Sequence, residues 1–353
     1  MKVKAKEVAA MLGLSEATVS LALNGKPGVS ERTRQKVLQC VSNLQENIPA
    51  VQEALLPERS LQKRSIKAIV YISSVVYYDD LMGGLFSRPY LKVYQMASER
   101  GMDVRLMYIG LEDDIEQILA ESETDGTAGI FLMVSALPEE LQQKIARYTG
   151  PVPVMIDGVD GADDESSADS AADVVMIDNR DAVYQCMNYL RKMGHREILF
   201  CENSASMYNF NARKRAFLQY CRQEGLLCGE QYCLKMGETI EEAYKSMQTW
   251  IQGGNPQGIT AILAENYSVA VGCIRALQDA GRRIPEDMSV IGIDDLPEAV
   301  LLDFKYTHIR IDHEVKTQWA MNCLFARIDG QRGERIKIYT GTRLIPGESV
   351  KKL

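Results

Sequence analysis

The pattern of apolar positions divides the chain into a short N-terminal part and a long remainder that begins at Ser65. In the remainder, short apolar runs alternate with stretches in which apolar side chains recur at helical spacing. The apolar runs predict buried strands at 66–72, 103–109, 129–134, 152–157, 174–178, 197–202, 261–265 and 289–295. The helical stretches lie near 90–100, 113–121, 138–148, 180–192, 211–224, 241–251 and 267–280. Such alternation is typical of parallel sheets covered by helices on both faces.

The size of this remainder favours two lobes. About nine strands spread over residues 65–353 exceed what one hydrophobic core comfortably holds. We therefore expect an α/β body of two doubly wound parallel-sheet lobes. The first is formed by about 65–177 and 310–339, and the second by about 178–309 and 340–353. Ligands of such folds bind outside the carboxyl ends of the strands, which predicts a site in the cleft between the lobes.

The N-terminal part has the pattern of three short helices. Apolar residues at helical spacing fill 6–12, and Gly13 then permits a tight turn. Ser15 is a candidate N-cap for the second helix, and Ser30 is a candidate N-cap for the third. Short helices joined in this way predict an all-α helix-turn-helix domain over residues 1–48.

Charge is unevenly spread along the chain. The net charge is −8, yet residues 1–64 hold ten Lys or Arg against six Glu and no Asp. The remainder is therefore acidic. A basic end on an acidic body fits a polyanion-binding domain attached to a body that does not itself bind polyanions.

Signals for membrane insertion and secretion are weak. No segment approaches the roughly 18 consecutive apolar residues of a membrane span. The lysine-rich start before Val8–Leu14 lacks a small-residue cleavage site. The eight cysteines include no C-x-x-C pair. We therefore expect a cytoplasmic chain with reduced thiols, no metal, no cofactor and no membrane partner.

Several motifs together resemble the lactose repressor (LacI) family of bacterial transcription regulators. "KEVAAMLGLSEATVSLALNGKPGVSERTRQKV" at 6–37 is similar to the family's DNA-binding domain, notably in Thr18-Val19-Ser20, Leu23-Asn24-Gly25 and Val29-Ser30-Glu31. The family's body is resembled by "IDN", "RKMGHREILFCE", "RKRAF", "AENYSVAVG", "MSVIGIDD" and "THIRID", in the family's order. The resemblance implies a periplasmic-binding-protein-like body. It also implies a homodimer that docks on a pseudo-palindromic operator, with assembly beyond the dimer left open.

The resemblance also implies which residues contact DNA. The second helix would lie in the major groove, where Glu16 could accept a hydrogen bond from cytosine N4 and Ala17 could touch a thymine methyl. Leu21 stands where many relatives carry arginine. The remaining residues are suited to phosphate contacts. They are Lys4, Lys6, Ser15, Thr18, Ser20, Asn24, Ser30 and Arg34.

Residues 49–64 are expected to be a linker. In the family, a hinge helix in this segment pushes a leucine into the minor groove. Counting from Pro49 places Leu56 at that position, with Pro57 directly after it to stop the helix. A second register would instead use Leu61 as the wedge.

The resemblance further implies effector-binding residues. Arg213, Asn266 and Asp294 fall where sugar-binding relatives hold ligand hydroxyls, and their side chains offer both donors and acceptors to vicinal hydroxyls. Tyr267 replaces the family's common aspartate after the asparagine. Aromatic residues after the first strand are candidates to face a sugar ring. They are Tyr77, Tyr78 and Phe86.

Enzymatic and metal-binding alternatives find little support. The chain has no G-x-S-x-G elbow, phosphate-binding loop or strand-linked G-x-G-x-x-G, and "HEVKT" at 313–317 lacks the second histidine of a metalloprotease helix. His195 and His308 are expected at surface or loop positions. The acidic stretch 157–173 lacks the spacing of a calcium loop and is expected to be a solvated loop.

We therefore interpret the chain as an operator-binding regulator, most simply a repressor, that is switched by a small molecule. The expected partners are double-stranded operator DNA, a sugar or sugar derivative, and a second copy of the chain. Three alternatives stay open: a solute-binding protein without a DNA role, a non-sugar effector such as a nucleobase, and control by a partner protein. The direction of the switch, induction or co-repression, is also open.

Overall fold

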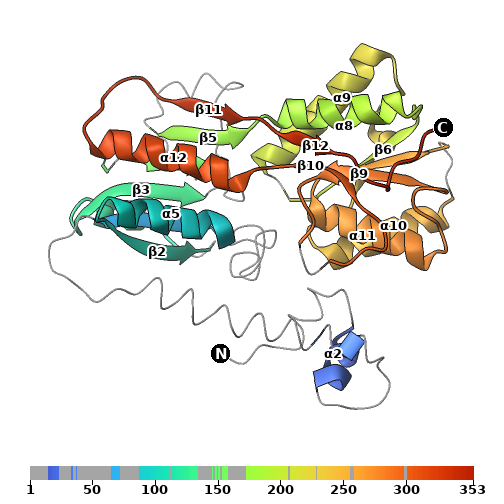
Figure 1. Cartoon of the computed structure of the whole chain (residues 1–353), viewed down its shortest axis with the longest axis horizontal. Helices are drawn as coiled ribbons and strands as arrows, with labels where there is room; N and C mark the ends of the chain where they lie inside the picture. The colour runs from blue at the N-terminus through green and yellow to red at the C-terminus, as the bar shows by residue number, and fades with distance from the viewer. Residues whose placement is uncertain are drawn as a thin grey trace.

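The structure is a computed structural model. It describes residues 15–23, 33–34, 37, 65–71, 87–110, 113–133, 145, 148, 150–151, 153–157, 172–205, 207–227, 229–254, 258–297 and 300–353. Two six-stranded sheets, each with helices on its faces, lie side by side, so the prediction of two doubly wound lobes is confirmed (Figure 1). We call them lobe 1, which contains the first strand, and lobe 2.

The sheet of lobe 1 has the strand order β11-β5-β4-β3-β1-β2, with neighbouring strands parallel. Its strands are β1 (Ser65–Tyr71), β2 (Asp103–Ile109), β3 (Thr127–Met133), β4 (Pro153–Ile156), β5 (Asp173–Ile177) and β11 (Lys337–Thr340). Its described helices are α5 (Ser87–Glu99), α6 (Ile115–Ser122) and α12 (His313–Ile328). Helix α12 packs on α5 and across β3, β4 and β5.

The sheet of lobe 2 has the equivalent order β12-β10-β9-β8-β6-β7. Its strands are β6 (Ile198–Glu202), β7 (Cys233–Lys235), β8 (Ala261–Ala264), β9 (Ser289–Ile293), β10 (Thr307–Arg310) and β12 (Arg343–Ile345). Only β12 runs antiparallel to its described neighbour. Its helices are α8 (Asn179–Lys192), α9 (Tyr208–Glu224), α10 (Ile240–Gln252) and α11 (Tyr267–Asp279), with the 3₁₀ turn η2 (Glu230–Tyr232).

The chain passes between the lobes after β5, after β10 and after β11. Helix α8 therefore follows a strand of lobe 1 but packs on β9 and β10 of lobe 2, whereas α12 follows a strand of lobe 2 but packs on lobe 1. The carboxyl ends of β4, β5, β8 and β9 lie near the points where the chain crosses between the lobes. The residues that follow these strands therefore face the junction of the lobes.

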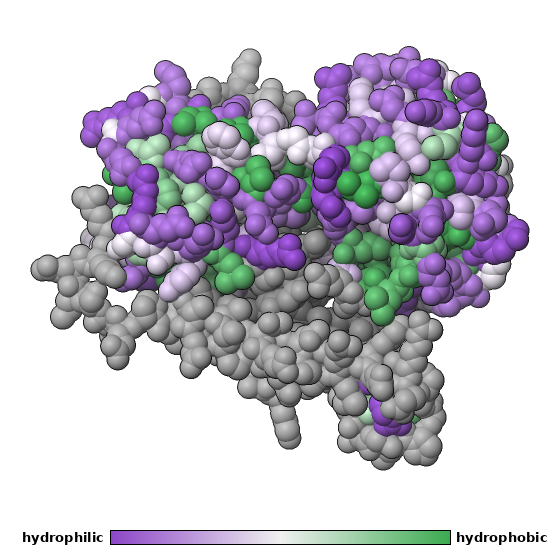
Figure 2. Space-filling view, viewed as in Figure 1, coloured by the Kyte–Doolittle hydropathy of each residue, from purple (hydrophilic) through white to green (hydrophobic). Residues whose placement is uncertain are grey.

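Each lobe buries its own apolar core. In lobe 2, Phe200 and Phe217 stack with ring centroids 5.0 Å apart, and both side chains are fully buried. In lobe 1, Ile66 and Phe131 lie beneath α5 and α12. The described residues on the face shown in Figure 2 are mostly hydrophilic, with apolar side chains in scattered groups. None of the described helices is long and apolar enough to cross a membrane.

The predicted elements agree with the observed ones to within a few residues where the structure describes them. Four strands were not predicted, because they are three or four residues long and most of them are only partly apolar; they are β7, β10, β11 and β12. Helix α12 was not predicted either. The helix predicted over 138–148 lies almost wholly outside the described residues. Six described cysteines are free thiols, and no cluster of metal-ligating side chains occurs among the described residues.

Candidate effector cleft and DNA-binding domain

Arg213 is a buried and hydrogen-bonded cation at the junction of the lobes. It projects from α9 of lobe 2, and its side chain is 4% exposed. The guanidinium donates from Nε to Asn179 Oδ1 at 3.0 Å and from Nη1 to the Glu265 backbone carbonyl at 2.7 Å. Asn179 in turn donates to Asn209. These bonds fix the plane of the guanidinium, which is the geometry that bidentate recognition requires.

Asp294 directly follows β9 and faces Arg213. Its Oδ2 atom lies 3.8 Å from Arg213 Nη1, and its side chain is 14% exposed. Burial raises the pKa of the Asp294 carboxyl, while the cations Arg213 and Lys316 oppose that shift. The residue has a positive φ of 80°, a conformation that non-glycine residues rarely adopt and that is concentrated at functional sites. The sequence-predicted pair Arg213 and Asp294 is therefore brought together at one strand end.

Asn266 and Tyr267 stand at the carboxyl end of β8. The Asn266 side chain accepts a hydrogen bond from Val269 N at 3.0 Å and so caps helix α11. This oxygen is thus committed to the helix, although the side chain is buried beside Arg213's partner Glu265. Tyr267 is half-buried and is the first residue of α11. Their roles as effector contacts stay predictions.

Glu265 is a buried carboxyl that the sequence pattern does not single out. Its Oε2 atom accepts a hydrogen bond from Asn203 N at 2.7 Å, and its Oε1 atom is buried without a hydrogen-bond partner among the described residues. Burial raises the pKa of Glu265 to about 8, against the opposing effects of the Asn203 N–H and of Arg213. The side chain is therefore mostly protonated at neutral pH, and can act as a hydrogen-bond donor as well as an acceptor.

Lobe 1 contributes a second buried ion pair that was also missed. Lys316 Nζ on α12 lies 2.5 Å from Asp157 Oδ2, and the two side chains are 2% and 7% exposed. Asp157 directly follows β4, has a positive φ of 58°, and leaves Oδ1 buried without a partner among the described residues. A single lysine in the first turn of a helix gives no sequence signal for burial, since lysines are usually exposed.

These findings correct the expectation of a solvated loop over 157–173. Both ends of that stretch are buried ion-pair partners, because Asp173 is fully buried and accepts two hydrogen bonds at 2.8 Å from the guanidinium of Arg327. Residues 158–171 lie outside the described residues.

The histidines also differ in part from expectation. His308 lies in strand β10 and is buried, with Nε2 2.9 Å from Asp295 Oδ1, so its predicted surface or loop position was wrong. His195 lies in a loop but is fully buried, 2.9 Å from the Thr260 hydroxyl. Near the cleft, burial and the neighbouring Lys316 lower the pKa of His313 to about 3, so this imidazole is neutral.

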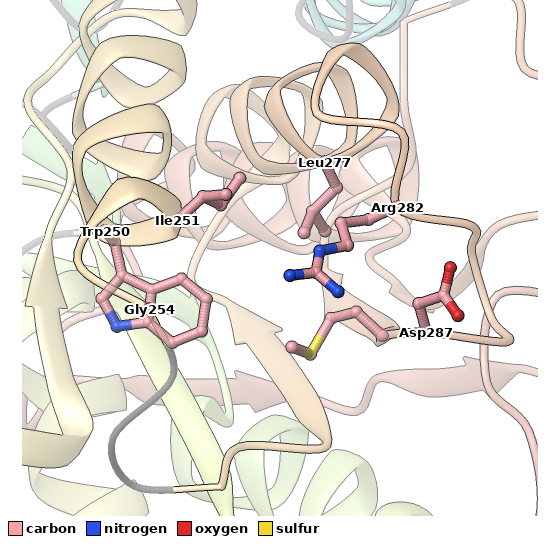
Figure 3. A pocket seen from close by; sticks show the side chains of 7 residues that line it. Trp250, Ile251, Gly254, Leu277, Arg282 and Asp287 are labelled. Atoms are coloured by element: carbon pink, nitrogen blue, oxygen red, sulfur yellow. The ribbon is translucent and has the colours of Figure 1, made fainter.

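The remaining predicted effector residues, Tyr77, Tyr78 and Phe86, lie outside the described residues. A small cavity elsewhere in lobe 2 contains none of the predicted site residues (Figure 3). It measures about 90 Å³, below the several hundred Å³ typical of a small-molecule site, and lies between the ends of α10 and α11 at the start of β9. Its lining is Trp250, Ile251, Gly254, Leu277, Arg282, Asp287 and Met288.

The described part of the N-terminal domain is helix α2 (Glu16–Leu23) with its cap. Ser15 Oγ accepts a hydrogen bond from Thr18 N at 3.1 Å, which confirms the predicted N-cap. Val19 and Ala22 are buried, whereas Ala17 and Ser20 are exposed on one face, one turn apart. Arg34 donates to the Ala22 carbonyl at 3.2 Å, so this guanidinium also ties the following segment to α2.

Other predicted DNA contacts cannot be placed in this way. Leu21 is half-buried, and Thr18 shares a hydrogen bond of 2.8 Å with the Ser15 hydroxyl. The residues outside the described part of the chain are Lys4, Lys6, Asn24, Ser30 and Leu56, with the alternative wedge Leu61. The exposed face of α2 is thus the part of the predicted DNA surface that the structure describes.

Two family descriptions match the chain. Residues 4–45 match "Bacterial regulatory proteins, lacI family", and residues 187–350 match "Periplasmic binding protein-like domain". Among curated proteins, the HTH-type transcriptional repressor PurR of Photorhabdus laumondii is 26% identical over 350 residues, covering 98% of this chain and 96% of the relative. PurR of Vibrio cholerae is also 26% identical over 350 residues, covering 99% and 98%.

Solved structures share the fold over the whole chain. The complex of the transcriptional regulator CelR with cellobiose has a TM-score of 0.68 at 21% identity, covering 99% of this chain and 100% of that chain. The lac repressor dimer bound to operator and the anti-inducer ONPF has a TM-score of 0.68 at 18% identity, with the same coverage. The order of domains and the two-lobed body thus recur in full.

Proposed function

This chain belongs to the lacI family of bacterial regulatory proteins, as a DNA-binding repressor with an effector-binding body, and we propose that a small polar effector bound at Arg213 and Asp294 sets its affinity for operator DNA. The observation that supports this effector site is the guanidinium of Arg213, whose plane is fixed by two hydrogen bonds. It lies beside the carboxyl of Asp294 at the end of β9. A regulator needs no catalytic group here, only differential binding to two arrangements of the lobes.

A sugar or sugar derivative is the first candidate effector. Vicinal hydroxyls offer a donor beside an acceptor, which complements a guanidinium beside a carboxylate. The similar regulator CelR forms a complex with cellobiose. A nucleobase is the second candidate, favoured by the likeness to the PurR repressors. Cytoplasmic location and action as a homodimer on a pseudo-palindromic operator complete the proposal.

The first test is DNA binding by the full chain. Operators would be selected from a random duplex library, and affinity would be measured by fluorescence anisotropy. Between 50 and 200 mM salt, affinity should fall roughly 10³- to 10⁵-fold, because phosphate contacts release counterions. Affinity that stays flat over this range, or failure to select any operator, would contradict the DNA-binding role.

A matched pair of variants locates the DNA surface. Ser20→Asp places a carboxylate on the exposed face of α2, and should weaken operator binding at least about tenfold through repulsion of phosphates. Ser98→Asp makes the same change at an exposed position of α5 in lobe 1 and should leave binding unchanged. Equal losses in the two variants would show that net charge alone is responsible.

The second test addresses the effector. A thermal-shift screen over sugars, sugar phosphates, polyols, nucleobases and nucleosides should find a compound that stabilises the protein. At about 100 times its Kd, a ligand adds about 2.7 kcal/mol. Arg213→Ala should abolish the shift, whereas Arg215→Ala, an exposed arginine two residues along α9, should retain it. A shift that survives Arg213→Ala would place the effector elsewhere.

A further inference from the structure

Asp157 and Asp294 occupy equivalent places in the two lobes. Each follows the third strand in the order of its sheet, β4 in lobe 1 and β9 in lobe 2. Each donates its backbone N–H at 3.0 Å to the neighbouring strand, Asp157 to Val175 O and Asp294 to Ile309 O. Among the described residues, these two are also the non-glycine residues with positive φ. The fold thus presents one buried carboxyl from each lobe at the same point of the junction.

Each of these carboxylates has its own buried cation. Lys316 lies 2.5 Å from Asp157, and Arg213 lies 3.8 Å from Asp294. Both pairs lie where a central strand ends at the junction of the lobes, after β4 in lobe 1 and after β9 in lobe 2. The charges of Lys316 and Asp157 in lobe 1 act on the pKa of Asp294 in lobe 2. Two cations and two carboxylates therefore meet at the junction and balance.

Neighbouring titratable groups leave this balance unchanged at neutral pH. His313, on the same helix as Lys316, is neutral because its pKa is lowered to about 3 by burial and by the cations. Glu265 is mostly protonated because burial raises its pKa to about 8. Asp295 is offset by Arg310, whose Nη2 atom lies 2.8 Å away, and its Oδ1 atom also lies 2.9 Å from His308 Nε2.

The lobe 1 pair retains unused hydrogen-bonding capacity. Asp157 Oδ1 is buried and has no partner among the described residues. An ammonium group has three donors, and the described bond of Lys316 uses one of them. Lys316 and Asp157 therefore offer a donor beside an acceptor from lobe 1, as Arg213 and Asp294 do from lobe 2.

We propose that Lys316 and Asp157 form the lobe 1 half of the effector site. The balanced ion pairs of the two lobes restrict this site to an uncharged ligand that presents a donor beside an acceptor to each lobe. This inference rests on the proposed effector cleft. A ligand that brings a net charge into a site whose own charges already balance loses its hydration without gaining an unpaired counter-ion. A neutral sugar or nucleobase avoids that cost, whereas a phosphorylated one does not.

The test compares matched neutral and phosphorylated compounds on the full-length protein. Thermal shift and calorimetric Kd would be measured for glucose and glucose 6-phosphate, ribose and ribose 5-phosphate, cellobiose, and inosine and its monophosphate, together with hypoxanthine. An uncharged compound should bind at least about tenfold more tightly than its phosphorylated counterpart. The proposal is overturned if a phosphorylated member binds as well as or better than its neutral partner, or if no uncharged compound binds.

Variants that alter the balance distinguish a ligand contact from a structural role. Asp157→Asn leaves one excess positive charge, and should shift the ratio of the neutral to the phosphorylated Kd by at least about tenfold in favour of the phosphorylated compound. The double variant Asp157→Asn with Lys316→Met restores balance and should restore the preference for the neutral compound, even where Lys316→Met alone fails to fold. An unchanged ratio in Asp157→Asn overturns the proposal. Operator binding, measured in parallel without effector, reports separately on the proposed regulator.

Discussion

The two lobes share one strand order and place an aspartate with positive φ after the same strand, yet they hold the partner cation differently. In lobe 2, Arg213 is fixed by hydrogen bonds to Asn179 and to the Glu265 carbonyl, and stands 3.8 Å from Asp294. In lobe 1, Lys316 has one described bond, the 2.5 Å contact with Asp157. Among the described residues, the cation of lobe 2 is therefore positioned by several neighbours, and that of lobe 1 by its carboxylate.

This difference shows that the same fold can present two different kinds of ion pair at the cleft. An arginine that is already bonded to neutral groups keeps its orientation when a ligand displaces its carboxylate partner. A lysine that depends on one carboxylate is instead coupled to it, because either charge left alone in a buried site is costly. We therefore expect stability to depend more on the pair of lobe 1, although the sequence signature of the site lies in lobe 2.

The largest expected effect is that of Lys316→Met. The methionine fills a similar volume but leaves Asp157 buried without a counter-ion, which should lower the free energy of unfolding by about 3–5 kcal/mol at neutral pH. Arg213→Met should cost less, about 1–3 kcal/mol, because Asp294 is farther from its cation and more exposed. Urea denaturation followed by circular dichroism checks both.

The control is the double variant Lys316→Met with Asp157→Asn. Removing both charges should recover most of the lost stability, since a buried ion pair contributes little net free energy over neutral residues of similar size. If the double variant is as unstable as the single one, packing around Lys316 rather than charge is responsible, and the contrast between the lobes disappears.

The second prediction concerns pH and lobe 2. Because burial raises the folded-state pKa of Glu265 from its ordinary 4.5 to about 8, the folded state holds a proton that the unfolded state releases above about pH 4.5. Stability should therefore fall as pH rises through this window, by about 2–3 kcal/mol between pH 6 and pH 8. Glu265→Gln should remove most of this slope while retaining the size of the side chain.

Thermal unfolding of wild type and Glu265→Gln at several pH values measures the difference. The two proteins should diverge most at pH 8, with the variant the more stable. Parallel curves from pH 6 to pH 8 would show that Glu265 is ionised in the folded state throughout, and that its free Oε1 atom is hydrated.

The elements and the site differ in how far the sequence could predict them. The apolar strands β1 and β3 to β6 were recognised because both faces of a parallel sheet are buried, which leaves a continuous apolar run. The short strand β12 pairs at a sheet edge through Arg343–Ile345, and three residues are too few to form a pattern. Length matters more than edge position, since the seven-residue edge strand β2 was predicted and the four-residue interior strand β10 was missed.

The site residues of lobe 2 could be predicted for a different reason. Arg213 and Asp294 lie in motifs that resemble a known family, whereas Lys316 lies in "HEVKT", which resembles only an incomplete metalloprotease helix. Lys316 and Asp157 are separated by 159 residues in sequence. Charges so far apart carry no local signal of pairing, and single charged residues are usually exposed.

The third prediction compares glycines that lie under close packing in each sheet. A Cβ at Gly292 in β9 would stand 2.9 Å from the Ala264 carbonyl oxygen and closer still to the Tyr306 hydroxyl. A Cβ at Gly129 in β3 would meet the ends of Leu324 at 2.7 Å and Ile328 at 2.9 Å. Backbone cannot move aside as a methyl group can, so Gly292→Ala should cost about 2–3 kcal/mol and Gly129→Ala about 1 kcal/mol.

Differential scanning calorimetry of the two variants tests this order. A similar loss in both would indicate that lobe 1 is as rigidly packed beneath α12 as lobe 2 is between its central strands. A larger loss in Gly129→Ala would reverse the contrast altogether.

The smallest expected effects are those of helix caps, one from each lobe. Asp114 caps α6 by accepting from Glu116 N at 3.0 Å and Gln117 N at 3.2 Å. Thr239 caps α10 in a reciprocal capping box with Glu242. Alanine at either position should cost about 1 kcal/mol, because first-turn N–H groups lose their acceptor.

The Glu242 carboxylate still accepts from the backbone N–H of residue 239 after Thr239→Ala, which should hold the loss in lobe 2 slightly below that of Asp114→Ala in lobe 1. Native-state hydrogen exchange of the amides in the first turn of each helix measures the two losses separately. Thr239→Ser should retain wild-type protection, since its hydroxyl makes the same bond. Loss of protection in Thr239→Ser equal to that in Thr239→Ala would show that the threonine methyl, rather than the capping hydroxyl, stabilises this turn.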